Sequence, residues 1–128
     1  MAVTRTIKGT MDRLSVSGGS EITYLGPTAT GNVGDLTRCF RVTPSAVGPI
    51  IVKIDKSYGL IDMEIFQEDS FNGSSAPAGY QRHFNIFKAG KDKGALGIQV
   101  TNAAKTFVVL LNFDTYANAS YTGSVTIP

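Results

Sequence analysis

The chain of 128 residues contains one cysteine, one histidine and no tryptophan. The single cysteine, Cys39, excludes an intrachain disulfide, and no Cys/His spacing fits a zinc site. A Ser-His-Asp triad would need the lone His83 beside an activated serine, and no serine has a nucleophile-elbow pattern around it. No glycine-rich stretch has the spacing of a phosphate-binding loop. We therefore expect no catalytic residues, no cofactor and no enzymatic activity.

Neither an excess of charge nor a long apolar run is present. Twelve basic and ten acidic residues give a net charge of +2, which predicts no strong attraction to DNA, RNA or anionic lipid. The densest basic stretch, KAGKDKG, contains Lys88, Lys91 and Lys93. It is typical of a solvated hairpin tip, and contact with a polyanion is the alternative. The first residues, MAVTRTIKGT, contain no apolar run for a signal peptide or a membrane span. We expect a protein made in a cytoplasm, with no nucleic-acid partner and no membrane insertion.

Apolar residues alternate with polar ones along most of the chain. AVTRTIK, TFVVLLNF and YTGSVTI each place β-branched or aromatic residues on one side of an extended strand. Clusters of Gly, Pro, Asn, Asp and Ser separate about ten such segments, and no window shows a helical face. The pattern predicts an all-β fold, an antiparallel β-sandwich with jelly-roll-like topology. Its expected core is Phe40, Val42, Val52, Ile54, Ile61, Met63, Ile65, Phe84, Ile86, Phe107, Val109, Leu111, Val125 and Ile127.

The first 20 residues permit two interpretations. The alternating apolar residues Val3, Ile7, Leu14 and Val16 favour strand pairing, and the SGGS sequence at 17–20 supplies a flexible joint. Residues 1–20 could therefore form an N-terminal β arm that adds to a neighbouring subunit, with residues 21–128 as a single β-sandwich domain. The alternative is an ordinary first hairpin that packs on its own sandwich.

The longest stretch of low hydrophobicity is QEDSFNGSSAPAGYQ, residues 67–81. It contains two aromatic residues, Phe71 and Tyr80, in a loop-forming context. One interpretation is a disordered loop, and the other is a contact surface ordered by a partner. We include Phe71 and Tyr80 among the candidate assembly contacts.

Residues 50–69, IIVKIDKSYGLIDMEIFQED, combine acidic and apolar side chains. Asp62 and Glu64 lie two residues apart on one strand face, so their Cβ atoms are about 6–7 Å apart. That spacing could bracket a cation, with Glu68 and Asp69 of the following loop as further ligands. The favoured alternative is a solvated strand face, on which Asp55, Asp62, Glu64 and Phe66 point outward, and no required metal.

Residues 38–128 resemble the bacterial pre-peptidase C-terminal domain, a small jelly-roll module. The corresponding segments are CFRVTP, GPIIVKID, GLIDMEIF and FVVLLNFDTYANASYTGSVTI. In this resemblance Asp62 and Glu64 occupy the two acidic positions of a D-x-D-L-Y-like strand, and Phe66 occupies the aromatic position. If the calcium site of some family members carried over, Asp62 and Glu64 would be its residues.

The whole chain also resembles the small jelly-roll proteins of phage particles in size and strand content. This resemblance implies a non-enzymatic virion component, such as a capsid decoration or cementing protein or a tail-associated subunit. Its partners would be capsid or tail proteins and further copies of itself, and its location the virion. The alternative is an adhesive β-sandwich module that binds carbohydrate or another surface.

Overall fold

The computed structural model describes residues 2–10, 14–16, 19–26, 37–70, 81–84, 94–113 and 119–128, and for residues 14–16, 26, 61, 70 and 81–84 it describes the backbone alone. This part of the chain contains ten strands and one short 3₁₀ turn, η1 (Glu68–Ser70). The strands are β1 (Val3–Thr10), β2 (Leu14–Val16), β3 (Ile22–Gly26), β4 (Thr37–Val42), β5 (Gly48–Tyr58), β6 (Leu60–Gln67), β7 (Gln81–Phe84), β8 (Gly94–Val100), β9 (Phe107–Phe113) and β10 (Ser120–Ile127). The predicted all-β class is confirmed.

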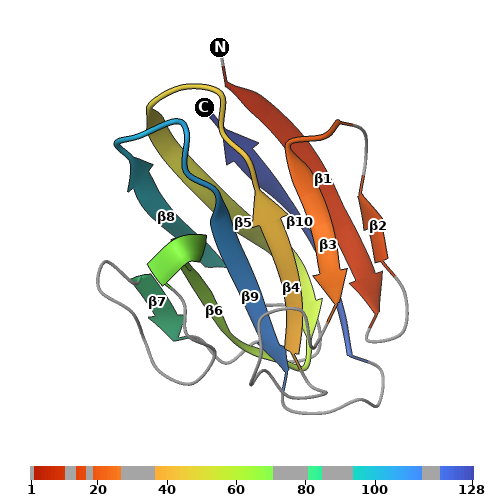
Figure 1. Ribbon diagram of the computed structural model, residues 1–128. Helices are drawn as coiled ribbons and strands as arrows, with labels where there is room; N and C mark the ends of the chain where they lie inside the picture. Colours follow the sequence, from red (N-terminus) through yellow and green to blue (C-terminus); the bar gives the residue numbers. More distant parts are fainter. Residues whose placement is uncertain are drawn as a thin grey trace.

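The strands form two antiparallel sheets that pack face to face (Figure 1). The first sheet has the order β2-β1-β10-β5-β8 and the second has the order β3-β4-β9-β6-β7. Without the outermost strands β2 and β3, the remaining strands make two four-stranded sheets, β1-β10-β5-β8 and β4-β9-β6-β7. This order is the wiring of a jelly roll, in which two Greek keys share the sheets. The predicted sandwich with jelly-roll-like topology is therefore the fold of the chain.

The first strand belongs to the interior of the first sheet. β1 pairs with β10 along its whole length, from Val3 opposite Ile127 to Thr10 opposite Ser120, and β2 pairs with its other edge. Ile7 is fully buried. Residues 3–10 therefore pair within their own chain, as the alternative of an ordinary first hairpin expects. Exchange of this segment between subunits stays a prediction.

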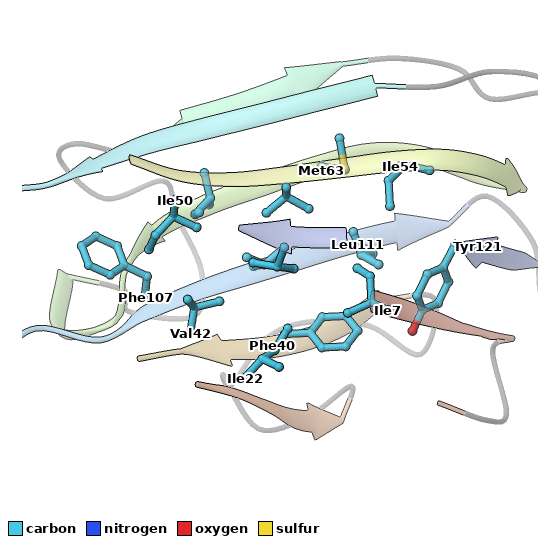
Figure 2. Packing of buried hydrophobic residues seen from close by; sticks show 14 of the residues in the cluster. Ile7, Ile22, Phe40, Val42, Ile50, Ile54, Met63, Phe107, Leu111 and Tyr121 are labelled. Atoms are coloured by element: carbon cyan, nitrogen blue, oxygen red, sulfur yellow. The ribbon is translucent and has the colours of Figure 1, made fainter. Parts of the chain in front are cut away.

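The core lies between the inner faces of the two sheets (Figure 2). Successive side chains of a strand point to opposite faces, so every second residue of each strand enters this layer. Every predicted core residue whose side chain is described is buried: Phe40, Val42, Val52, Ile54, Met63, Ile65, Phe107, Val109, Leu111, Val125 and Ile127.

Three further predicted core residues remain. Ile86 lies outside the described residues, and of Ile61 and Phe84 the structure describes the backbone alone. The register pairs Phe84 with Asp62, and it pairs the core residue Met63 with His83. The core assignment of these three residues therefore stays a prediction.

One part of the core is a chain of aromatic rings. Tyr24 packs on Phe40 with ring centroids 5.7 Å apart, and Tyr121 packs on Phe40 at 6.3 Å and on Phe113 at 5.9 Å. Burial raises the pKa of the Tyr121 hydroxyl well above its ordinary value. Arg38, two residues before Phe40 on the same strand face, is also buried and donates from Nη1 to the carbonyl oxygen of Thr37 at 2.8 Å.

Candidate functional site: the outer faces of the two sheets

The outer face of the first sheet carries many hydroxyl groups. On β1 and β10 every second residue points to this face, and each of them is threonine, serine or lysine. We call this surface the open face, because most of its residues are exposed. It comprises Thr4, Thr6, Lys8, Thr10, Pro49, Ile51, Lys53, Asp55, Lys56, Tyr58, Ala95, Gly97, Gln99, Ser120, Thr122, Ser124 and Thr126.

Three lysines lie close together on the open face. The register pairs Lys8 with Thr122 and Thr122 with Lys56, so the backbones of Lys8 and Lys56 are two strand spacings, about 10 Å, apart. Lys53 pairs with Ser124, two residues further along β10. None of the three forms an ion pair with a described residue. Hydroxyl groups and ammonium groups are therefore the main hydrogen-bond donors of this surface.

A β-bulge brings Lys56 to the open face. β10 pairs Gly123 with Ile54 but pairs the preceding Thr122 with Lys56, so Asp55 is an extra residue on β5. Strict alternation after Ile54 would have turned Lys56 toward the core. Gly123 permits β10 and β5 to approach each other closely at the bulge, because a Cβ atom at this position would overlap the carbonyl oxygen of Lys53.

The sequence prediction did not recognise this lysine group. It placed Asp55 outward, which the structure confirms, since Asp55 is exposed. It did not place Lys8 near Lys53 and Lys56, because β10 lies between β1 and β5 in the sheet. A glycine inside an otherwise regular strand pattern, here Gly123, is the local signal that could have indicated the bulge.

The outer face of the second sheet is closed. Cys39, Phe66, Val108 and Leu110 point away from the core, yet each is at most 4% exposed. They form a second apolar cluster, against which the partly buried Leu25 packs. The register places Cys39 opposite Leu110 and Val108 opposite Phe66, so the cluster extends across β4, β9 and β6.

The two metal candidates of the sequence, Asp62 and Glu64, lie next to this cluster. Asn112 donates from Nδ2 to Asp62 Oδ1 and to Glu64 Oε2, the latter at 2.5 Å. Thr37 Oγ1 donates in turn to Asn112 Oδ1 at 2.9 Å. An amide nitrogen carries two hydrogens, so one asparagine side chain serves both carboxylates and holds them together.

The prediction that these carboxylates are mainly solvent-facing is wrong for Asp62, which is 2% exposed, and Glu64 is only partly exposed. Phe66 does point outward but is also buried, at 1% exposed. These side chains are buried because the second apolar cluster lies on the same face of the sheet, and a strand that is covered on both faces has no solvent-exposed side. Asp55 on the first sheet is exposed, as predicted.

The other two acidic residues of segment 50–69 on this side, Glu68 and Asp69, form ion pairs with Arg41 and Lys105. Glu68 accepts two hydrogen bonds from Arg41, 2.8 Å from Nε and 2.7 Å from Nη2, and a third from Thr106 at 2.9 Å. The Arg41 guanidinium holds the pKa of Glu68 below its ordinary value. Asp69 accepts from Lys105 Nζ at 2.6 Å, and this contact lowers its pKa. Glu68 lies six residues beyond Asp62, about 20 Å along an extended chain, so it does not join Asp62 and Glu64.

The predicted assembly contacts have different surroundings. Ile7 is in the core and Val3 packs at its margin, whereas Leu14 and Val16 lie in β2, of which the backbone is described. Phe71 and Tyr80 lie outside the described residues, as do Lys88, Lys91 and Lys93.

Among the described residues, no three or more His, Cys, Asp and Glu side chains group as metal ligands. In the same part of the chain no helix is long and apolar enough to span a membrane.

No protein-family model matches the chain, and no curated protein matches it either.

Proposed function

We propose that the chain is a non-enzymatic structural protein that assembles through protein–protein contacts. Its setting would be a phage virion, as a capsid decoration or cementing protein or a tail-associated subunit with capsid or tail proteins as partners. The observation that carries the proposal is the jelly-roll wiring β1-β10-β5-β8 over β4-β9-β6-β7, which recurs in viral capsid domains.

An exposed apolar residue near both chain ends supports a contact point there. Val47 is 62% exposed, the largest value among the large hydrophobic residues that the structure describes. Its loop is held to the C-terminal residue, because Ser45 N donates to the carbonyl oxygen of Pro128 at 3.1 Å. The two chain ends lie at this end of the sandwich (Figure 1). An apolar side chain on a held loop can enter a pocket of a partner at little entropic cost.

A second candidate function is a carbohydrate- or surface-binding adhesive module. Jelly rolls also occur in lectin domains, and the open face combines hydroxyl groups with the exposed ring of Tyr58, which is 39% exposed. An exposed ring next to hydrogen-bonding groups is an arrangement that can hold a sugar.

Sedimentation velocity of the purified chain over a range of concentrations, with electron microscopy of the same samples, tests the assembly proposal. We expect defined oligomers, and we expect Val47→Lys to dissociate them because it buries a charge in the contact. Gln99→Lys adds the same charge on the open face and should leave the oligomers intact.

A chain that sediments as a monomer at every concentration and that does not add to a purified particle would contradict the proposal. Binding of that monomer to defined glycans on an array would then favour the adhesive module.

A further inference from the structure

Charged side chains are distributed unequally between the two sides of the sandwich. On the side of the second sheet, Arg41 pairs with Glu68 and Lys105 with Asp69. The carboxylates of Asp62 and Glu64 lie on that side too, bound to Asn112. The open face of the first sheet has three lysines and a single described carboxylate, Asp55. Among the described residues, a sequence with balanced charges therefore gives a locally basic open face.

The three lysines surround hydroxyl groups in two neighbouring cross-strand rows. The first row is Lys8, Thr122 and Lys56. The second row is Thr6, Ser124 and Lys53. Lysine ammonium groups and Ser/Thr hydroxyls are the groups with which proteins commonly hold phosphate oxygens. A linear polyanion lying across these rows would meet a donor at each step.

The composition of the open face distinguishes between kinds of anionic partner. The central parts of protein–protein interfaces are depleted in lysine and serine and enriched in aromatic and large apolar residues. The open face has the opposite composition, with Ile51 as its one large aliphatic residue. A partner that offers phosphate groups therefore suits the open face better than an acidic protein does.

One exposed aromatic ring lies next to the lysines. Tyr58 follows Lys56 by two residues, points to the same side, and pairs with Ser120 in the next row. A sequence-independent site for single strands combines a basic track for the backbone with an aromatic ring on which a base stacks. Duplexes and sulfated polysaccharides offer no free base to such a ring.

We propose that the open face binds a single-stranded nucleic acid, with Lys8, Lys53, Lys56 and the adjacent hydroxyls on its phosphates and Tyr58 stacked on a base. This binding goes beyond the proposed assembly function and does not depend on it. The sequence predicted no nucleic-acid partner because its charges cancel in sum. The fold places these charges on different faces of the sandwich, and the net charge of the sequence does not reveal how they are distributed.

Fluorescence anisotropy of the full chain with a labelled oligothymidine single strand tests the proposal, measured as a function of salt. The triple variant Lys8→Gln/Lys53→Gln/Lys56→Gln should lower the magnitude of the slope of log K against log salt by about 2, since each phosphate contact on a single strand contributes about 0.7. Tyr58→Leu should weaken binding about fivefold or more without changing that slope.

Matched controls keep the test specific. Lys105→Gln removes a lysine from the side of the second sheet and should leave the oligonucleotide affinity within about twofold and the slope unchanged. Lys88, Lys91 and Lys93 are unchanged in every variant, so they cannot account for a difference between them. Unaltered thermal unfolding of the triple variant shows that the fold is intact, because the three substitutions are on exposed side chains.

Two results would overturn the proposal. One is an oligonucleotide affinity that is the same in wild type and in the triple variant, or no binding at low salt. The other is lysine-dependent binding of a heparin fragment with none of the oligonucleotide, which would assign the face to sulfated polysaccharide. Sedimentation of the same variants reports assembly separately, so loss of nucleic-acid binding and loss of assembly are distinguishable.

Discussion

Thr122 and Leu110 occupy corresponding positions in the two sheets. Each lies on an interior strand, β10 or β9, and each points away from the shared core. Thr122 is exposed, whereas Leu110 is 4% exposed. Alternation along a strand therefore determines the face on which a side chain lies, but it does not determine whether that face is exposed to solvent. Composition supplies the missing information, because hydroxyls and lysines occupy one outer face and Cys39, Phe66, Val108 and Leu110 the other.

The largest expected effect contrasts outward residues of the two sheets. Phe66→Ala should lower the free energy of unfolding by about 3–5 kcal/mol, because it empties a fully packed position, although Phe66 points away from the main core. Thr122→Val should change it by no more than about 0.5 kcal/mol, since its side chain is at the surface. Urea denaturation of both variants measures the difference.

Leu111→Ala serves as the inner-face reference for that experiment. Leu111 is fully buried between the sheets, so its truncation should cost about 2–5 kcal/mol. If Phe66→Ala costs as little as Thr122→Val while Leu111→Ala costs several kcal/mol, the second outer face is not part of the folded interior.

A smaller loss of stability is expected on substitution of two glycines of the first sheet, and its size should differ between them. Gly123→Ala should cost about 1–3 kcal/mol, because the new Cβ would overlap the carbonyl oxygen of Lys53 at the bulge. At Gly97 the nearest neighbour, the carbonyl oxygen of Ile50, would lie 3.2 Å from the Cβ. Gly97→Ala should therefore cost less than Gly123→Ala when thermal unfolding of the two is compared. Equal losses would argue against the bulge as the cause.

The smallest effect concerns the ion pairs on the side of the second sheet. The pKa of Glu68 is lowered from 4.5, chiefly by its hydrogen bonds with Arg41. The ionised carboxylate therefore stabilises the fold above pH 4.5, and this contribution is lost as the pH falls through the lowered value. Glu68→Gln should cost about 0.2–1 kcal/mol at neutral pH. The difference from wild type should vanish in acid.

Unfolding free energies of both proteins between neutral pH and pH 3 measure this convergence. Arg41→Gln should give the same loss at neutral pH, because it removes the other half of the pair. A difference that persists undiminished in acid would assign the effect of Glu68→Gln to something other than its charge.

Period-two alternation was sufficient to predict the sandwich and most of its core. Residues such as Phe40, Val52 and Val109 lie where a regular strand places them, and the jelly-roll-like topology is also as predicted. The environment of the second outer face was predicted incorrectly. The continuous apolar run FVVLL at 107–111 in β9 is a sign of a strand buried on both faces, but only its alternate residues were assigned to the core.

The candidate site was less accessible to sequence reasoning. Lys8 and Lys56 are far apart in the chain and become neighbours only through β10, and sequence spacing cannot reveal such a relation. The bulge at Asp55 reverses the alternation after Ile54, so a regular pattern assigns Lys56 to the wrong face. Asn112 was likewise not recognised as the partner of Asp62 and Glu64, because its role depends on the pairing of β9 with β6.

The difference between the two outer faces can be measured directly through the reactivity of thiols toward a thiol reagent. Cys39 is the one cysteine of the chain and lies on the closed face, fully buried. Thr122→Cys in a Cys39→Ala background places the same group on the open face. We expect the Thr122→Cys thiol to react in the native protein nearly as fast as in denaturant, and native Cys39 to react at least about a hundredfold more slowly, through local opening alone. Labelling of native Cys39 as fast as that of the Thr122→Cys thiol would show that both outer faces are open and would contradict the distinction between them.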